Sequence, residues 1–246
     1  MRLQGKIAIV TGAGSGMGAA IAKTYAREGA HVTVADIDGG AAKKVADQIG
    51  RAAMAVKCDV TKRRDIDAVV VETASKFGGL NILVNNAGVA HVNKPLLEVD
   101  EKEFERVFAV NVKGLFMFTQ AVVPLMKGKG GVIINIGSTA GLRPRPGLSA
   151  YNATKGAVHN LTKTLAVELA PEKIRVCAIA PVATDTPLLP TFLGPAPGMR
   201  EKFVATVPLG RLATAQDIAD TALFLASEEA KFLTGNIMEV DGGRCV

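Results

Sequence analysis

Tryptophan is absent from this 246-residue chain, and aromatic residues of all kinds make up only 4% of it. Cysteine and histidine are also sparse, with three of each. Cys58, Cys177 and Cys245 are odd in number and far apart, which disfavours both a disulfide framework and a zinc ligand set. The three histidines do not cluster either, so the sequence predicts no metal site.

The sequence also lacks long apolar runs. The longest, Leu115 to Met126, is interrupted by polar residues and by Pro124, and it is shorter than the roughly 20 residues that a membrane span needs. The apolar segment from Ile7 to Val10 is too short for a signal peptide. The net charge of +6 comes from scattered basic residues rather than a stripe, which disfavours a nucleic-acid surface in so aromatic-poor a chain. We expect a soluble, cytoplasmic protein without membrane or nucleic-acid partners.

Seven short β-rich segments alternate with longer amphipathic ones. Their apolar residues are consecutive, which is typical of parallel strands covered on both faces, and the spacers are long enough for right-handed helical crossovers. The sequence predicts one α/β domain over residues 1–246, a doubly wound Rossmann fold with a seven-stranded, mainly parallel sheet flanked by helices. The expected strands are Ile7–Val10, Val32–Ala35, Met54–Val56, Ile82–Val84, Val132–Ile136, Val176–Ile179 and Ile237–Val240.

Two helix starts can be read from capping motifs. Asp100 followed by Glu103 forms a capping box, in which side chains and backbone N–H groups at the helix start satisfy one another. Thr214 followed by Asp217 opens a second helix. The buried stripe expected on that second helix consists of Ile218, Ala222 and Leu225.

A glycine-rich turn, Thr11-Gly12-Ala13-Gly14-Ser15-Gly16-Met17-Gly18, follows the first strand and leads into helix-prone sequence from Ala19 to Glu28. Glycines let backbone N–H groups approach a pyrophosphate, and the positive helix N-terminus favours the negative charge. Glycine-rich turns are common, so the motif gains meaning from its position between a strand and a helix.

The nature of the dinucleotide is indicated by Asp36, which closes the second strand. A carboxylate there can accept hydrogen bonds from an adenosine ribose and repel a 2′-phosphate. Ser15 and Ile37 are uncharged where a 2′-phosphate binder would present Lys or Arg, so NAD is favoured over NADP. An alternative remains open, in which Asp36 merely begins the turn Asp36–Gly39.

Tyr151 and Lys155 stand four residues apart, on one face of a helix, and Ser138 precedes Tyr151 by thirteen residues. A free phenol has a pKa near ~10 and is a poor acid–base catalyst at neutral pH unless a neighbouring ammonium favours the phenolate. The trio predicts proton transfer at a carbonyl or alcohol oxygen. Tyr and Lys also occur four apart on many helices that have no catalytic role.

With these motifs in order, the sequence resembles the classical short-chain dehydrogenases/reductases from about Gly5 to Gly243. The Thr-Gly-x-x-x-Gly-x-Gly turn of that family matches the segment 11–18. Cys58-Asp59-Val60 looks like the segment whose Asp meets the adenine ring, and Asn85-Asn86-Ala87-Gly88 resembles the motif after the fourth strand. Asn111 matches the asparagine of the family's catalytic tetrad.

The resemblance implies an NAD-dependent oxidoreductase that interconverts a secondary alcohol and a ketone. Lys155 would contact the nicotinamide ribose and, with the oxidised nicotinamide, lower the pKa of Tyr151, while Ser138 would hold the substrate oxygen. Asn111 would anchor a water that links Lys155 to solvent. A structural role is expected for Asn85 and Asn86. The cofactor-binding residues implied are Gly12, Ser15, Gly16, Met17, Gly18, Asp36, Ile37, Asp59, Val60, Asn86, Ala87, Gly88, Tyr151, Lys155, Pro181, Val182, Thr184 and Thr186.

The chain departs from the family pattern after the sixth strand. Many relatives read Pro-Gly where this chain has Pro181-Val182, which makes the backbone less free. This loop is expected to pack against nicotinamide, with Thr186 near the carboxamide. Thr154 stands where Ser is commoner, at a position expected to support packing. The family also implies a homotetramer, built through the long helices after strands four and five and the C-terminal segment ending at Gly243.

Residues 187–208 are expected to form a mobile apolar lid over the substrate. With Leu142, Leu148, His91 and Val182 as neighbours, the lid favours an apolar secondary alcohol or ketone over a polyol. Alternatively, the lid residues pack on one another or on a neighbouring subunit. We expect His91 to be a surface or hydrogen-bonding residue rather than a second catalyst. The lid contains Leu188, Leu189, Phe192, Leu193, Met199 and Phe203, with Pro187, Pro190, Pro195, Pro197, Pro208, Gly194 and Gly198 between and around them.

Two other functions remain open. Arg143 and Arg145 lie between Ser138 and Tyr151 and could attract an acyl carrier protein or a CoA thioester, as in a 3-oxoacyl reductase. Many such relatives use NADP, against which Asp36 argues. A catalytically silent dinucleotide sensor is the other possibility, and the intact tetrad argues against it.

Overall fold

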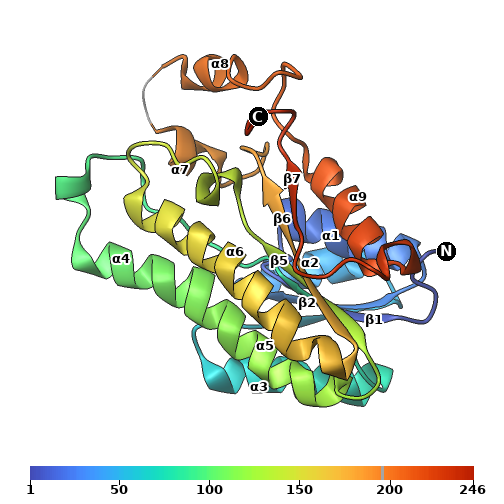
Figure 1. Ribbon diagram of the computed structural model, residues 1–246. Coiled ribbons are helices and arrows are strands. Elements are labelled where there is room, and N and C mark those ends of the chain that lie inside the picture. Colours follow the sequence, from blue (N-terminus) through green and yellow to red (C-terminus); the bar gives the residue numbers. More distant parts are fainter. Residues whose placement is uncertain (195–196) are drawn as a thin grey trace.

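Seven parallel strands form one sheet with helices on both faces (Figure 1). The computed structural model describes residues 1–194 and 197–246. The strand order is β3-β2-β1-β4-β5-β6-β7, and every neighbouring pair is parallel. The predicted doubly wound sheet is confirmed, and it is wholly parallel. The strands are β1 (Ile7–Thr11), β2 (His31–Asp36), β3 (Ala53–Lys57), β4 (Ile82–Asn85), β5 (Gly131–Ile136), β6 (Ile174–Pro181) and β7 (Ile237–Val240).

Most strands extend beyond their predicted apolar cores. The largest difference is in β6, which the sequence predicts over Val176–Ile179. Its pairing with β5 begins at Ile174, opposite Gly131, and its pairing with β7 continues to Pro181. Ladder hydrogen bonds therefore extend the strand into positions that hydrophobicity alone does not mark.

Each face of the sheet carries its own hydrophobic core. In β1, Ala8 and Val10 point to one face and Ile9 to the other, because successive strand residues alternate. Helices α1, α2 and α9 cover the first face, and α3, α5 and α6 cover the second (Figure 1). The bounds of these helices are α1 (Gly16–Arg27), α2 (Gly39–Ile49), α3 (Arg63–Phe77), α5 (Leu115–Met126), α6 (Ser149–Leu169) and α9 (Ala215–Ala226).

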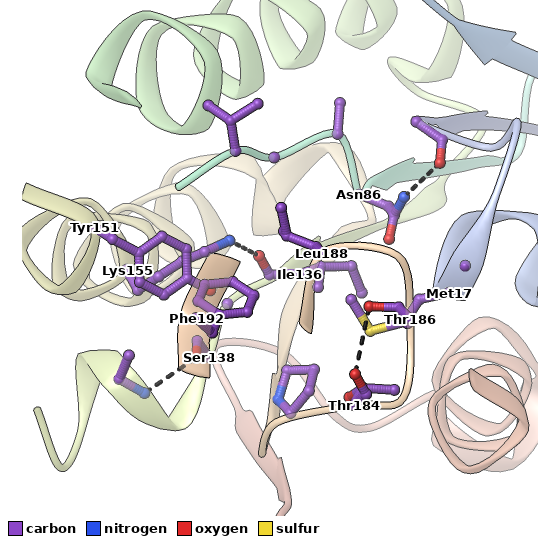
Figure 2. A pocket seen from close by; sticks show the side chains of 18 of the residues that line it. Met17, Asn86, Ile136, Ser138, Tyr151, Lys155, Thr184, Thr186, Leu188 and Phe192 are labelled. Atoms are coloured by element: carbon purple, nitrogen blue, oxygen red, sulfur yellow. Dashed lines mark hydrogen bonds between the residues drawn. The ribbon is translucent and has the colours of Figure 1, made fainter. Parts of the chain in front are cut away.

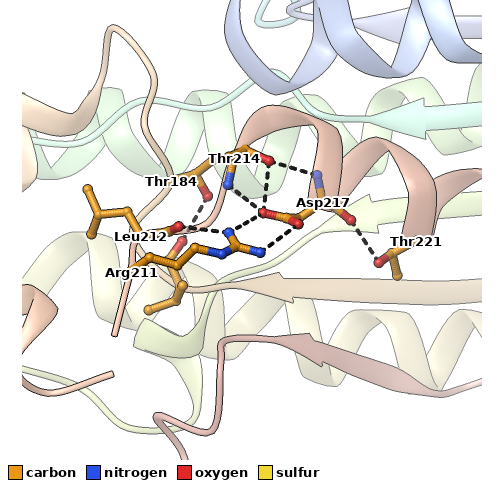
Figure 3. A network of polar contacts seen from close by, with 7 residues as sticks. Thr184, Arg211, Leu212, Thr214, Asp217 and Thr221 are labelled. Atoms are coloured by element: carbon orange, nitrogen blue, oxygen red, sulfur yellow. Dashed lines mark hydrogen bonds and ion pairs between the residues drawn. The ribbon is translucent and has the colours of Figure 1, made fainter. Parts of the chain in front are cut away.

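Both predicted capping boxes are present. Asp100 and Glu103 open α4 (Glu101–Phe108), and Thr214 and Asp217 open α9. Figure 3 shows the second network, in which Arg211 also forms an ion pair with Asp217, with N–O distances of 2.6 and 3.0 Å. These contacts hold the pKa of the Asp217 carboxyl well below its usual range. The expected α9 stripe is buried, as residues Ile218, Ala222 and Leu225.

Helices α4 and α5 are joined by a π-helical turn, Ala109–Gly114. The resulting helix, Glu101–Met126, is long and apolar enough by length and composition to cross a membrane. Length and composition alone are weak evidence for a membrane span, because core helices of soluble proteins share them. Here the helix packs against α3 and α6. The helix is longer than the apolar run 115–126 seen in the sequence, because the π turn joins α4 to α5 without a break.

The carboxyl ends of β1 and β4 form the point at which the strand order reverses. The chain runs from β1 outward to β3 and then returns to β4 on the other side of β1. Ligands of doubly wound sheets bind in the crevice at such a point. Two short helices, α7 (Leu189–Leu193) and α8 (Met199–Val204), follow β6 and lie near this end of the sheet (Figure 1).

Candidate active site

The glycine-rich turn joins β1 to α1, which begins at Gly16 and so includes the last glycines of the motif. Gly12 and Gly16 have positive φ angles, +61° and +54°. A Cβ on Gly18 would lie 2.3 Å from the carbonyl oxygen of Gly12 and 2.5 Å from Nδ2 of Asn86. Gly18 therefore lets the helix start pack against the turn, and it does not itself line the cavity described below.

Asn86 holds the glycine turn in place. Its Nδ2 donates to the carbonyl oxygens of Thr11 at 2.8 Å and Gly12 at 3.0 Å. The Thr11 hydroxyl in turn accepts from the backbone N–H groups of Asn86 and Ala87, both at 3.0 Å. The structural role expected for Asn86 is thus present in its contacts, and the side chain also borders the cavity.

Asn85 belongs to a buried polar chain. Its Nδ2 donates to Oδ1 of Asn135 at 2.9 Å and to the Thr119 hydroxyl at 3.3 Å, and Nδ2 of Asn135 donates to the Thr162 hydroxyl at 3.0 Å. The chain ties β4 and β5 to α5 and α6, so the structural role of Asn85 is clear. Sequence reasoning missed Asn135, although a single Asn within the apolar run 132–136 indicates a buried polar side chain that needs hydrogen-bond partners.

Asp36 begins the turn that was one of the two alternatives left open by the sequence. Its Oδ2 accepts from the backbone N–H of Gly14 at 2.8 Å, and its Oδ1 accepts from that of Asp38 at 2.9 Å. The carboxylate thus begins a turn and also faces the cavity. Each carboxylate oxygen keeps a second acceptor site, so Asp36 can still bind a ribose hydroxyl. Ile37 beside it is 63% exposed.

Ser138, Tyr151 and Lys155 lie side by side at the other end of the same cavity (Figure 2). Ser138 follows β5, and Tyr151 and Lys155 come from the first two turns of α6. Nζ of Lys155 donates to the carbonyl oxygen of Ile136 at 2.8 Å and lies 5.6 Å from the centre of the Tyr151 ring. The i, i+4 spacing read from the sequence therefore does place the phenol and the ammonium together.

Burial dominates the titration of both side chains. It raises the pKa of Tyr151 to about 12, while the Ser138 hydroxyl and the Arg145 charge lower it. Burial also lowers the pKa of Lys155 to about 8. In the protein alone, desolvation of the phenolate outweighs the nearby charges. The lowering expected from Lys155 together with the oxidised nicotinamide stays a prediction. The cation that does favour the phenolate is Arg145, which sequence reasoning did not assign to this task.

Asn111 lies in the π-helical turn and does not line the cavity. Its Oδ1 accepts from the N–H of Val89 at 2.9 Å, and its Nδ2 donates to the carbonyl of Val89 and to the Thr154 hydroxyl. A Cβ on Gly88 would lie 3.5 Å from Oδ1 of Asn111 and 3.8 Å from Nζ of Lys155, so the two groups flank one position. A water linking Asn111 with Lys155 stays a prediction. Thr154 supports packing as expected.

His159, one turn after Lys155 on α6, is a site residue that sequence reasoning missed. Its Nε2 accepts from the backbone N–H of Ser138 at 3.4 Å. Burial first, and then Lys155 and Lys163, lower the pKa of this imidazole to about 4. His159 is therefore neutral at pH 7 and supports the backbone of Ser138. In the sequence, only its position four residues after Lys155, on the same face of the helix, could have indicated that His159 lies near the site.

The loop after β6 accommodates valine without strain. Val182 is buried in the core, and none of the described non-glycine residues except Lys173 has a positive φ. Asp185 donates its N–H to the carbonyl of Ala213, which lies between Arg211 and Thr214 in the network that opens α9. Thr186 reaches the glycine turn, since a Cβ on Gly16 would lie 3.4 Å from its side chain. Glycine is thus not required at position 182.

The lid contributes only part of its apolar side chains to the cavity. Leu188, Phe192 and Phe203 line it, and the Phe192 ring lies 4.9 Å from that of Tyr151. The predicted lid residue Pro195 lies outside the described residues. Leu189 and Leu193 instead belong to the hydrophobic core on one face of the sheet, and Met199 packs against it, an arrangement that neither sequence alternative named.

Two neighbours expected for the substrate are not in the cavity. His91 is only 1% exposed, so of the two expected roles the surface one does not apply. It makes the hydrogen bond that was the other expectation, from Nδ1 to the carbonyl of Val92 at 2.9 Å. Leu142 is exposed and does not line the cavity. Leu148 and Val182 do line the cavity.

The cavity extends from the glycine turn to Ser138, Tyr151 and Lys155 and has a volume of about 440 Å³. Such a volume is in the range of small-molecule sites. The shape and lining of the cavity fit an extended dinucleotide. Glycines leave room for it at the turn, the Asp36 carboxylate lies at that end, and the Tyr151–Lys155 pair lies at the other. Of the residues implied for cofactor binding, those that line the cavity are Gly12, Ser15, Gly16, Met17, Asp36, Ile37, Asp59, Val60, Asn86, Ala87, Gly88, Tyr151, Lys155, Pro181, Val182, Thr184 and Thr186.

One group of possible metal ligands occurs among the described residues. Glu239, Asp241 and Cys245 place ligand atoms within 4.8 Å of one another. The Asp241 carboxylate is already bonded to the N–H groups of Gly243 and Cys245, so it shapes the turn after β7. All three cysteines are free.

Comparisons with known proteins agree with this geometry. Residues 12–244 match the family described as enoyl-(acyl carrier protein) reductase. The chain is 44% identical to 4-formylbenzenesulfonate dehydrogenase of Comamonas testosteroni, with 99% of each chain covered. It is 39% identical to a 3-oxoacyl-[acyl-carrier-protein] reductase of Thermotoga maritima, again with 99% of each covered.

A solved structure shares the fold closely. It is the 3-ketoacyl-(acyl-carrier-protein) reductase from Brucella melitensis complexed with NADH, with 47% identity and a TM-score of 0.95 over 99% of this chain and 100% of that one. A sorbitol dehydrogenase of Cereibacter sphaeroides is 40% identical over 99% of this chain and 98% of its own. The motifs, the wholly parallel sheet and these relatives lead to one conclusion: the chain belongs to the classical short-chain dehydrogenase/reductase family of oxidoreductases.

Proposed function

We propose that this protein interconverts a secondary alcohol and a ketone with NAD(H), with Tyr151 as the acid–base group. The observation that carries the proposal is the single cavity that holds Asp36 and the glycine turn at one end and Ser138, Tyr151 and Lys155 at the other. The relative of known structure binds NADH, and Asp36 stands where a 2′-phosphate would be repelled.

The residues of this chain handle the proton. In alcohol oxidation the Tyr151 phenolate accepts the hydroxyl proton, and in ketone reduction the phenol returns it. The Ser138 hydroxyl orients the same substrate oxygen, and the Arg145 charge favours the phenolate. Lys155, whose Nζ lies 5.6 Å from the centre of the Tyr151 ring, adds positive charge together with the oxidised nicotinamide. When bound, the nicotinamide supplies or accepts the hydride. The apolar walls, Leu148 and Phe192 among them, exclude water from the reacting atoms.

Reduction of 3-oxoacyl thioesters is the second candidate function. It is favoured by Arg143, Arg145 and Arg244, which line the cavity beyond Tyr151, and by relatives named as acyl-carrier-protein reductases. Titrating the purified protein with NADH and NADPH, and then supplying secondary alcohols or acetoacetyl-CoA, separates the two. Tight NADH binding with alcohol turnover supports the leading function, whereas NADPH preference with thioester reduction contradicts it.

A homotetramer in the cytoplasm completes the proposal. Helices α4, α5 and α6, which follow β4 and β5, expose Phe104, Phe116 and Val167 by 47%, 41% and 80%. Exposed apolar side chains on these helices are suited to contact between copies of the chain. Light scattering coupled to gel filtration gives the mass in solution, and a monomer would contradict the tetramer.

A further inference from the structure

Three arginines gather at the end of the cavity that contains Tyr151. Arg145 comes from the loop before α6 and Arg244 from the segment after β7, and both guanidinium groups lie over the ring of Phe203, at 5.1 and 5.3 Å from its centre. Arg143 donates to the carbonyl oxygen of Arg244, which ties the two segments together. All three arginines line the cavity.

This arginine cluster, Arg143, Arg145 and Arg244, has no negative partner in the part of the chain that the structure describes. None of the ion pairs there involves these residues. The acidic residues that line the cavity, Asp36 and Asp59, belong to the end with the glycine turn. Burial and the charge of Arg244 lower the pKa of Arg145, as expected when like charges are brought together out of water. A bound anion would relieve both costs.

The position of Arg145 limits how far the anion lies from the reaction. Arg145 is close enough to Tyr151 to affect the pKa of the phenol, and it donates a hydrogen bond to the carbonyl of Phe192, whose ring packs on Tyr151. An anionic group bound here would therefore lie near Tyr151, within reach of the molecule that carries the reacting carbon. The first negative charge of a CoA or carrier-bound thioester lies at the far end of the long pantetheine arm.

We propose that the substrate is a secondary alcohol or ketone with an apolar body and a carboxylate or sulfonate group, which the arginine cluster binds through Arg145 and Arg244. Phe192, Phe203 and Leu148 contact the apolar body. Guanidinium groups form paired hydrogen bonds with either oxyanion, so we expect the cluster to select for a negative charge without distinguishing a carboxylate from a sulfonate. This inference rests on the proposed function and narrows it to one substrate class.

The test compares matched substrates with NAD⁺. These are 4-(1-hydroxyethyl)benzoate, the corresponding benzenesulfonate, and the neutral 4-(1-hydroxyethyl)benzamide. The wild-type protein should turn over at least one of the anions with a kcat/KM roughly ten times or more that of the amide, because hydrogen bonds to a charged group carry the difference. Acetoacetyl-CoA with NADH, measured beside them, should be the poorer substrate.

Variants locate the effect. Arg244→Gln should bring the ratio of kcat/KM for anion and amide close to one, and Arg244→Lys, which keeps the charge but loses the planar fork, should retain part of it. Arg51→Gln is the matched control, because it removes the same charge from an exposed position outside the cavity and should leave the ratio unchanged.

Each contrary result has its own meaning. Equal turnover of anions and amide by the wild type overturns the inference and leaves the proposed function intact. An equal loss of preference in Arg51→Gln overturns it in favour of long-range attraction, and faster turnover of acetoacetyl-CoA overturns it in favour of a thioester. If the protein neither binds NADH nor oxidises any of the alcohols, the proposed function itself is contradicted.

Discussion

Replacing Gly18 by alanine tests how the glycine turn is built. The new Cβ would lie 2.3 Å from the carbonyl oxygen of Gly12, 2.5 Å from Nδ2 of Asn86 and 2.9 Å from Cα of Ala13. All three distances are too short for real contacts, and two of the neighbours are backbone atoms that cannot swing away. The turn must therefore shift, and the hydrogen bond from Asn86 to the Gly12 carbonyl is strained with it.

Overpacking of this kind costs about 2 kcal/mol of the free energy of unfolding. For a chain of this length that lowers the Tm by roughly 4–8 °C. Because the shifted turn is the one that faces the cavity, the Kd for NADH should also rise, by roughly tenfold or more. Thermal unfolding followed by circular dichroism and titration of NADH fluorescence measure the two effects at one protein concentration.

The matched control is Gly156→Ala. Gly156 lies inside α6 beside Lys155, and a Cβ there would meet nothing within 4 Å. Alanine should raise stability by about 0.5–1 kcal/mol through helix propensity, with NADH binding unchanged. If Gly18→Ala bound NADH as the wild type does and melted at the same temperature, the packing argument for this turn would be refuted.

Two further substitutions test single side chains. Asp36→Asn removes the charge that repels a 2′-phosphate, so the preference for NADH over NADPH in binding should fall by roughly tenfold, and an unchanged ratio of Kd values contradicts this. His159→Gln should reduce the loss of stability at acid pH. Burial lowers the pKa of His159 to about 4, below the 6.5 of a free imidazole, so the unfolded chain binds the extra proton and the wild type loses stability as the pH falls from 6.5 to 4. Urea unfolding of both proteins across this window checks the prediction, and equal losses would exclude His159 as a source.

Local sequence patterns predicted those parts of the fold that depend on neighbours in the chain. The strand cores, the capping boxes at Asp100 and Thr214 and the glycine turn all follow from short-range rules of periodicity and backbone geometry. The strand ends did not, because pairing with a neighbour strand decides where β6 begins and ends.

The parts of the site that were missed depend on contacts between distant segments. Arg244 reaches the cavity from the segment after β7, more than ninety positions from Tyr151 in sequence. The buried contact between Asn85 and Asn135 joins two strands. The sequence left a surface and a hydrogen-bonding role open for His91, and the fold buries it. Tyr151 shows the same limit in its chemistry: the pattern identified its partner, but burial, which no local pattern reports, sets the direction of its pKa.

The central claim is that Tyr151 transfers a proton while hydride moves between NAD(H) and a carbon bearing oxygen. The most direct measurement follows reduced nicotinamide by its absorbance as NAD⁺ and a secondary alcohol are mixed with the wild type and with Tyr151→Phe, with NADH affinity measured for both. We predict turnover by the wild type, a loss of at least about a thousandfold in kcat for the variant, and closely similar Kd values for NADH. Retained turnover by Tyr151→Phe would contradict the account.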